Sequence, residues 1–187
     1  RAERINGLAL AQAETLLDVG AGFGTFCEEA SEFFDVIALE PEPHLAEPCR
    51  QKGLDVIEQP VEQASCERVD VVTAFEVIEH LFSPREFLGY VYDLMDPGGL
   101  LVLTCPNVKG FEIEALGTHS KAIDPEHLNL MHPDSLADLL RSEGFEVINR
   151  EIGEVVGELR GVRGEITTLK WLVGGTILAA VGTFLPP

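Results

Sequence analysis

The sequence has few basic residues. Its 187 residues include 13 Lys and Arg against 32 Asp and Glu, which gives a formal net charge of -19. Phosphate backbones are bound mainly by Lys and Arg, and a strongly negative protein repels them. We therefore expect that nucleic acid is not the partner of this protein. The charge itself favours solubility.

Cysteine is also scarce. Cys27, Cys49, Cys66 and Cys105 stand far apart, and no Cys-x-x-Cys pair occurs. This spacing predicts neither a zinc site nor a disulfide framework, so a reducing, cytoplasmic setting fits best. The first residue is Arg1, and no signal-peptide pattern precedes the first expected strand.

The sequence also lacks an apolar run of the roughly 20 residues that a membrane-spanning helix needs. The apolar stretch 171–185 falls short of that length and is interrupted by Gly174, Gly175 and Gly182. We expect residues 151–170 to form a connecting helix and residues 176–184 a final antiparallel edge strand. Membrane contact through this C-terminal tail is the alternative.

Short apolar runs alternate with helical patterns between residues 15 and 150. They are rich in Val, Ile and Leu without polar alternation, which is typical of parallel strands buried on both faces. The expected strands cover 15–20, 35–40, 54–59, 69–75, 100–105 and 145–149. The sequence predicts one α/β domain over 1–187, with its core at 15–150: a Rossmann-like, doubly wound, mostly parallel sheet with helices on both faces.

Capping residues, prolines and glycines predict where two helices and one turn begin. Ser83 and Glu86 form a capping-box pattern around Pro84, and Pro133 opens a second helix that stops at Gly144. The Asp-Pro-Gly-Gly sequence at 96–99 predicts a turn before the fifth strand.

Three alternate glycines follow the first expected strand, in the sequence LLDVGAGFG at 16–24. Glycine is needed where the backbone turns sharply and a ligand approaches its N–H groups. Glu40 ends the second expected strand close to the spacing at which a carboxylate meets ribose hydroxyls, about 20 residues on. Gly24 follows Gly22 one position sooner than the dinucleotide pattern requires. The motif therefore predicts an adenosine-containing ligand, with a nicotinamide cofactor disfavoured.

Residues 15–150 resemble the class I S-adenosylmethionine-dependent methyltransferases, in the group that includes the ubiquinone-biosynthesis O-methyltransferases. The matching motifs are LLDVGAGFG, Glu40-Pro41, FEVIEHL at 75–81 and Pro106-Asn107. The resemblance implies S-adenosylmethionine as cofactor and S-adenosylhomocysteine as product. The family's acid after the third strand, which accepts from the adenine amino group, is replaced here by QPVE, so Glu62 is the candidate substitute. The implied cofactor-binding residues are Asp18, Gly20, Ala21, Gly22, Gly24, Glu40, Pro41, Glu62, Phe75 and Glu76.

His80 and His127 are the candidate catalytic residues. Imidazole titrates near neutral pH, so either ring could take a proton from the methyl acceptor, while a role in shaping the loop is the alternative. Glu76 and Glu79 together with both histidines would suit Mg²⁺ or Mn²⁺. Similar positions bind metal in small-RNA 2′-O-methyltransferases and in some quinone-pathway enzymes. We nevertheless expect that no metal is required.

The expected function is methyl transfer to an oxygen of a small metabolite or a glycan. Residues 108–124 would be a substrate loop or lid. Two alternatives stay open: an RNA 2′-O-methyltransferase, and a non-catalytic module that binds the cofactor without turnover. The acceptor and the oligomeric state do not follow from the sequence.

Overall fold

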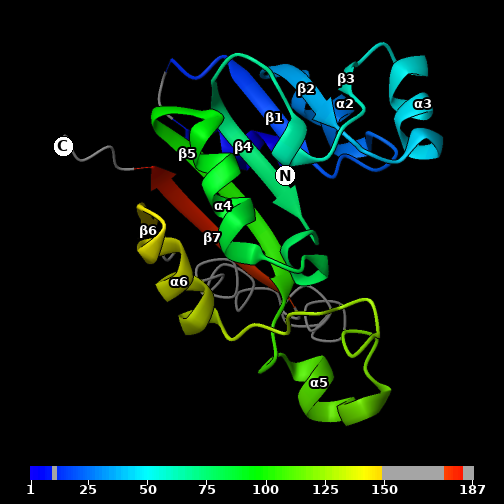
Figure 1. Cartoon of the computed structure of the whole chain (residues 1–187), viewed down its shortest axis with the longest axis vertical. Coiled ribbons are helices and arrows are strands. Elements are labelled where there is room, and N and C mark those ends of the chain that lie inside the picture. The colour runs from blue at the N-terminus through cyan, green and yellow to red at the C-terminus, as the bar shows by residue number, and fades with distance from the viewer. Residues whose placement is uncertain (10–11, 149–174, 183–187) are drawn as a thin grey trace, which may run out of the picture.

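The computed structural model describes residues 1–9, 12–148 and 175–182, the last of these as backbone. The described strands form one sheet in the order β3-β2-β1-β4-β5-β7-β6 (Figure 1). Five neighbouring strands are parallel, which confirms the predicted mostly parallel sheet. They are β1 (Thr15–Val19), β2 (Asp35–Leu39), β3 (Asp55–Ile57), β4 (Val69–Phe75) and β5 (Met95–Pro106).

The antiparallel strand is present, but its expected position at the edge is wrong. β7 (Gly175–Gly182) lies between β5 and β6 (Phe145–Ile148) and pairs antiparallel with both. The order agrees with the local sequences, because residues 176–181 carry no charged side chain, whereas β6 carries the exposed Glu146, which suits an edge.

The expected connecting helix at 151–170 lies outside the described residues, as do 171–174 and 183–185. Residues 175–182 form a strand of the sheet, so they are not part of a membrane-spanning helix. Within the described parts of the chain, no helix combines the length and hydropathy needed to cross a bilayer.

Two prolines begin helices as predicted, α4 (Pro84–Asp93) and α6 (Pro133–Ser142). The predicted capping box is wrong, because the Ser83 side chain makes no capping hydrogen bond and only its carbonyl accepts, from Phe87 N–H at 3.1 Å. The predicted turn at 96–99 lies inside β5 rather than before it, as an irregular stretch without partners on β4. These residues are the start of β5, where Gly98 has φ +82° and the pairing with β4 shifts register. Glycine absorbs the irregular backbone, so the strand continues through the sequence.

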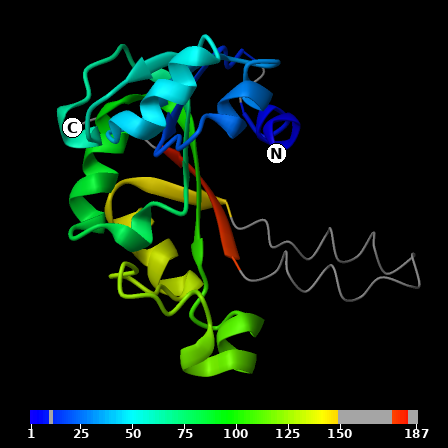
Figure 2. The same ribbon diagram turned by 90° about the vertical axis from the view of Figure 1, so that its right-hand side faces the viewer.

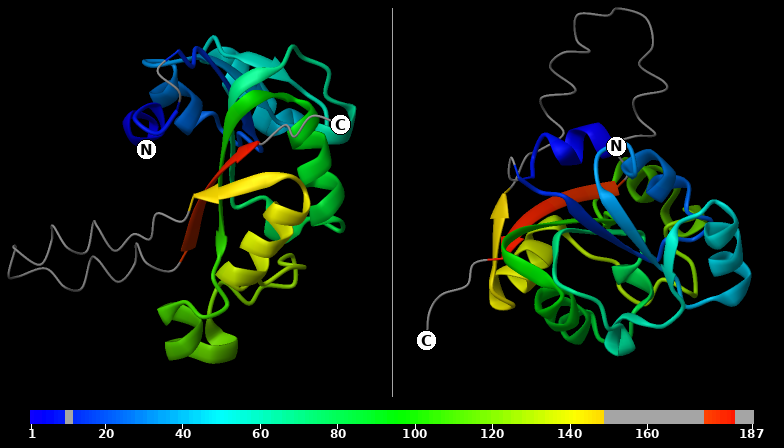
Figure 3. Two further views of the ribbon diagram at one scale, coloured as in Figure 1. Left: turned by 90° about the vertical axis from the view of Figure 1, so that its left-hand side faces the viewer. Right: turned by 90° about the horizontal axis from the view of Figure 1, so that it is seen from above.

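Helices cover both faces of the sheet, as predicted (Figures 2 and 3). Successive strand side chains point to opposite faces, and the two halves of the core follow this rule. Leu17 and Val72 pack on the face covered by α4 and α6. Their neighbours Leu16 and Val71 pack on the face of α1 (Ala2–Asn6) and α2 (Thr25–Ala30). A smaller cluster joins α2 to α3 (Pro43–Gln51).

The strand order reverses between β1 and β4. The chain from β1 proceeds to β2 on one side, while the chain from β4 proceeds to β5 on the other. In doubly wound sheets the carboxyl edge at such a reversal is where ligands bind. The glycine loop after β1 and the FEVIEHL segment after β4 both lie at this edge.

Candidate functional site

The glycine loop adopts a backbone that favours glycine at three positions. Gly20, Gly22 and Gly24 have φ values of +74°, +57° and +69°. A Cβ atom on Gly20 would lie 2.7 Å from Val77 Cγ2, so this glycine permits close approach to the chain after β4. A Cβ atom on Gly22 would meet nothing within 4 Å, so this part of the loop borders open space. Backbone N–H groups of Gly20 and Ala21 donate to the Leu39 carbonyl and fix the loop to β2.

Glu40 faces this loop from the end of β2. Its carboxylate is almost fully buried. One oxygen accepts from Gly22 N–H at 2.8 Å and the other accepts from Glu42 N–H at 3.0 Å. The structure thus brings Glu40 into contact with the glycine loop, while the ribose contact of Glu40 stays a prediction. Pro41 is exposed beside Glu40, and Glu62 is exposed on the 3-10 turn η1 (Val61–Gln63) that follows β3.

Asp18 lies beneath the loop and is only 3% exposed. The Thr73 hydroxyl donates to one carboxylate oxygen at 2.6 Å, and the Cys27 thiol donates to the other at 3.3 Å. Burial raises the pKa of Asp18 to about 6, although both hydrogen bonds act to lower it. Asp18 therefore joins β1, β4 and α2 under the loop, and its cofactor contact stays a prediction.

The chain changes direction sharply after β4. Phe75 packs edge-on against Phe26 at 4.8 Å between ring centroids. Glu76 has φ +55°. Among the described residues, no other residue except glycine has a positive φ. Thr104 holds this strained residue, because its carbonyl accepts from Glu76 N–H and its hydroxyl donates to Glu76 Oε1 at 2.7 Å. The chain then enters η2 (Ile78–His80).

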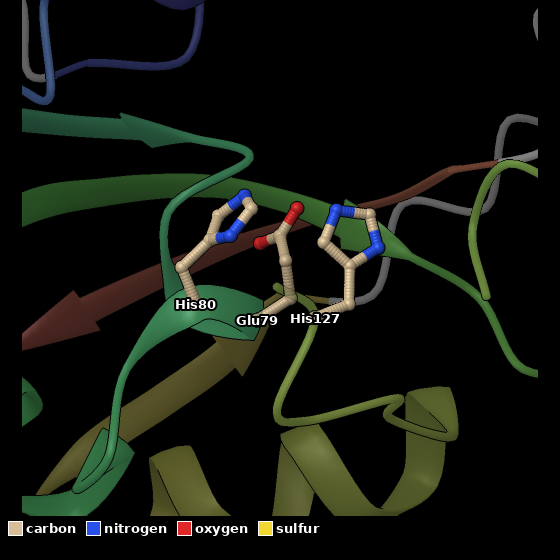
Figure 4. Close-up of side chains that lie close together, drawn as sticks. All are labelled: Glu79, His80 and His127. Carbon is tan, nitrogen blue, oxygen red and sulfur yellow. The ribbon is translucent and has the colours of Figure 1, made fainter. Parts of the chain in front are cut away.

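Glu79, His80 and His127 converge at this turn (Figure 4). One ligand atom of each lies within 4.8 Å of the others, and the two rings are 4.7 Å apart between centroids. His80 Nδ1 lies 3.1 Å from the Glu126 carbonyl, and His127 Nδ1 lies 2.9 Å from the Ala122 carbonyl. A carbonyl only accepts, so each neutral ring carries its proton on Nδ1 and keeps the Nε2 lone pair.

Glu79 is fully buried, and neither of its carboxylate oxygens has a hydrogen-bond partner. Burial raises the pKa of Glu79 to about 7. The nearby charge of Glu76 also raises this pKa, whereas His127 lowers it. The buried Glu79 carboxylate thus lies near two imidazole rings without a hydrogen-bond donor, which suits an added proton or a cation. Glu76 is not part of this group, so three of the four expected metal ligands come together.

The sequence predicted Glu79 only as a metal ligand and indicated no role at the site for Thr73 or Cys27. The motif EVIEH was the available signal for Glu79, but spacing does not reveal that its carboxylate is buried without a partner. Thr73 meets Asp18 across 55 residues of sequence. Such a contact exists only after β1 and β4 pair, and no local pattern predicts it.

The expected loop at 108–124 contains helical structure. It forms α5 (Phe111–Leu116) and the 3-10 turn η3 (Gly117–His119). Glu112 Oε1 accepts from the Ser120 hydroxyl and from Lys121 N–H, each at 3.0 Å, and closes the segment on itself. Figure 1 shows α5 at the far end of the molecule from β2 and β3.

A protein-family model described as a methyltransferase domain matches residues 2–150. The chain belongs to the methyltransferase domain family. This methyltransferase domain is 30% identical over 162 residues to a ubiquinone biosynthesis O-methyltransferase from Cereibacter sphaeroides. The match covers 75% of the chain and 63% of that relative, so the chain spans less than two thirds of the relative's length.

Solved structures share the fold of this methyltransferase domain. A 1,6-didemethyltoxoflavin-N1-methyltransferase from Burkholderia thailandensis, solved with S-adenosylhomocysteine, superimposes with a TM-score of 0.69 at 18% identity, covering 98% of this chain and 77% of that one. The [4+2]-cyclase SpnF gives the same TM-score at 15% identity, covering 98% and 81%. Because one fold serves two reactions, the fold alone does not fix the chemistry.

Two alanine substitutions separate backbone strain from collision in the glycine loop. We expect Gly22→Ala to lose about 1–2 kcal/mol of unfolding free energy, the general cost of a left-handed backbone for a residue with a Cβ atom. Gly20→Ala carries the same strain and adds the collision with Val77, so it loses more. Urea denaturation of both variants measures the difference. Equal losses, or a larger loss for Gly22→Ala, would contradict the described contact.

Asp18→Asn tests the buried carboxyl. Because the folded-state pKa of Asp18 is about 6, against an ordinary value of 3.8, the folded protein binds this proton more tightly than the unfolded chain. Ionisation of Asp18 therefore reduces the free energy of unfolding of wild type as pH rises from about 4 through about 6. Asparagine does not ionise, so the variant lacks this loss. We expect the stability of Asp18→Asn relative to wild type to rise by about 2–3 kcal/mol between pH 4 and 7. Chemical denaturation across this range checks it, and a constant difference would refute the assignment.

Proposed function

We propose that the chain is an S-adenosylmethionine-dependent methyltransferase that acts on an oxygen of a small metabolite or a glycan. One observation carries the proposal. At the strand-order reversal, the glycine loop and Glu40 follow β1 and β2, while Glu79 and His80 follow β4. His127 joins Glu79 and His80 from the segment between η3 and α6. A cofactor-binding element and a group able to take a proton thus share the carboxyl edge of one sheet.

The residues at the glycine loop fit the cofactor. Each Glu40 oxygen uses one lone pair on a backbone N–H and keeps another, so the carboxylate can accept from ribose hydroxyls. Gly22 leaves open the space that a side chain would fill. Gly20, Ala21 and Gly24 shape the loop for the amino-acid end of the ligand, and Pro41, Glu62, Phe75 and Glu76 are the remaining proposed contacts. When bound, the cofactor supplies an electrophilic methyl group on a sulfonium.

The chain's own residues would hold the acceptor and move its proton. Displacement by a hydroxyl oxygen is helped by a base, and His80 and His127 each keep an Nε2 lone pair for that purpose. Glu79 lies beside both rings, so its carboxylate would stabilise the imidazolium that forms. Alignment of the acceptor and exclusion of water complete the work of the site. The name of the Cereibacter relative, an O-methyltransferase, supports oxygen as the acceptor atom.

The charge supports a small acceptor rather than RNA. At a formal net charge of -19, the protein would repel a phosphate backbone. All four cysteines are free thiols, which agrees with the cytoplasmic location that we include in the proposal. Salt-dependent binding to an RNA 3′ end would instead favour the RNA 2′-O-methyltransferase alternative.

Cofactor binding provides the first test. We expect isothermal titration calorimetry to show that wild type binds S-adenosylmethionine and S-adenosylhomocysteine. Glu40→Gln should weaken both about 10- to 100-fold, because a hydrogen bond to a charged group is lost. Glu42→Gln is the matched control, an exposed neighbouring glutamate. Absence of binding to wild type, or equal binding by Glu40→Gln, would overturn the cofactor assignment.

The same protein, incubated with S-adenosylmethionine and a panel of hydroxyl-bearing metabolites and glycans, tests the reaction. Formation of S-adenosylhomocysteine together with an O-methylated product supports methyl transfer. Tight cofactor binding with no product across the panel would favour the non-catalytic module instead.

The cluster of Glu79, His80 and His127 suits either an added proton or a divalent cation. We propose the divalent cation as the second candidate. The specific observation in its favour is the buried Glu79 carboxylate without a partner. In addition, both histidines place Nδ1 on a backbone carbonyl, which is the usual orientation of metal-binding imidazoles. Such a cation would hold the acceptor oxygen and lower its pKa.

The cation candidate predicts that Mn²⁺ binds wild type and raises its melting temperature. Glu79→Gln should abolish the binding, because it removes the charged ligand. Glu47→Gln, an exposed glutamate on α3, is the control that should bind like wild type. Calorimetry with Mn²⁺ in the presence and absence of S-adenosylhomocysteine measures it. No binding in either state would leave the proton as the charge at this cluster.

A further inference from the structure

Asn129 joins the segment that carries His127 to the turn that carries Glu79 and His80. Its side-chain Nδ2 donates to the Leu81 carbonyl at 2.6 Å and lies 3.5 Å from the Ile78 carbonyl. Its backbone N–H donates to the Glu79 carbonyl at 2.9 Å. A single residue thus contacts the backbone of the turn on both sides of His80.

The segment around Asn129 has no regular structure of its own. Residues 127–130 belong to no helix or strand, so no backbone ladder fixes the position of His127. Two further contacts link the two parts, one between His80 Nδ1 and the Glu126 carbonyl and one between the His80 and His127 rings. Both of these contacts use the exposed ring of His80, whereas the Asn129 contacts use the backbone of the turn.

The chemistry of the contact requires an amide. The Leu81 and Ile78 carbonyls accept hydrogen bonds, and Asn129 meets them with an NH₂ donor. An aspartate of the same shape would place a negatively charged acceptor against these carbonyls. The asparagine therefore attaches the segment through a bond that no isosteric acid can make.

We propose that Asn129 is a positioning residue that sets the distance between His127 and the Glu79–His80 pair. Because His127 lies two residues before it, loss of the Asn129 contacts frees the His127 ring to leave the cluster. The inference rests on the proposed function, in which these residues serve methyl transfer. Asn129 itself has no described contact to the glycine loop or to Glu40, so cofactor affinity should not depend on it.

Proton NMR of the whole chain tests the proposal without an identified acceptor. Wild type should show a nuclear Overhauser cross-peak between the His80 and His127 rings, whose centroids are 4.7 Å apart. Single His80→Gln and His127→Gln variants assign it. Asn129→Ala and Asn129→Asp should lose the cross-peak, while their affinity for S-adenosylhomocysteine stays within about twofold of wild type. Gln51→Ala removes an amide from the exposed face of α3 and should keep the cross-peak.

The outcomes separate this proposal from the one it rests on. If both Asn129 variants keep the cross-peak, Asn129 does not position His127, and the proposed function stands. If wild type fails to bind S-adenosylhomocysteine, the proposed function falls whatever Asn129 does. If both variants unfold, or lose cofactor affinity together with the cross-peak, the role of Asn129 is general stability and the positioning proposal is overturned.

Discussion

The structure depends on the reversal of strand order between β1 and β4. These two strands pair in parallel along Leu16–Val19, yet the chain leaves them toward opposite sides of the sheet. Asp18 and Thr73 join the same two strands by a buried hydrogen bond directly beneath the edge. The loops that follow the strands therefore start as neighbours and diverge. The glycine loop and the Glu79–His80 turn owe their common location to this pairing.

The two sides of this edge are built differently. On the β1 side, backbone groups form the site, and glycines are needed because a side chain would collide at Gly20 or fill open space at Gly22. On the β4 side, side chains form the site, and a strained Glu76 backbone redirects the chain toward them. The backbone arrangement after β1 suits a ligand bound by close shape complementarity. The side-chain arrangement after β4 suits proton transfer or cation binding.

Local sequence patterns predicted the parts of the fold that depend on local structure. The parallel strands and the helices at Pro84 and Pro133 were found because apolar runs and prolines act over a few residues. The place of β7 between β5 and β6 depends on pairing between distant segments, which no local pattern encodes. The glycine spacing and Glu40 predicted a shared ligand site; the structure places Glu40 against the glycine loop, and the ligand contact itself stays a prediction. The buried state of Glu79 and the bonds of Asn129 depend on segments that meet only in the folded chain.

In the proposed function, the carboxyl edge at β1 and β4 holds the cofactor with its sulfur toward Glu79, His80 and His127. A crystal structure of the chain with S-adenosylhomocysteine tests it most directly. We predict ribose hydroxyls on the Glu40 carboxylate, the amino-acid end along the glycine loop, and the sulfur facing the cluster of Glu79 and the two histidines. A ligand bound elsewhere, or one whose sulfur faces away from that cluster, would contradict the account.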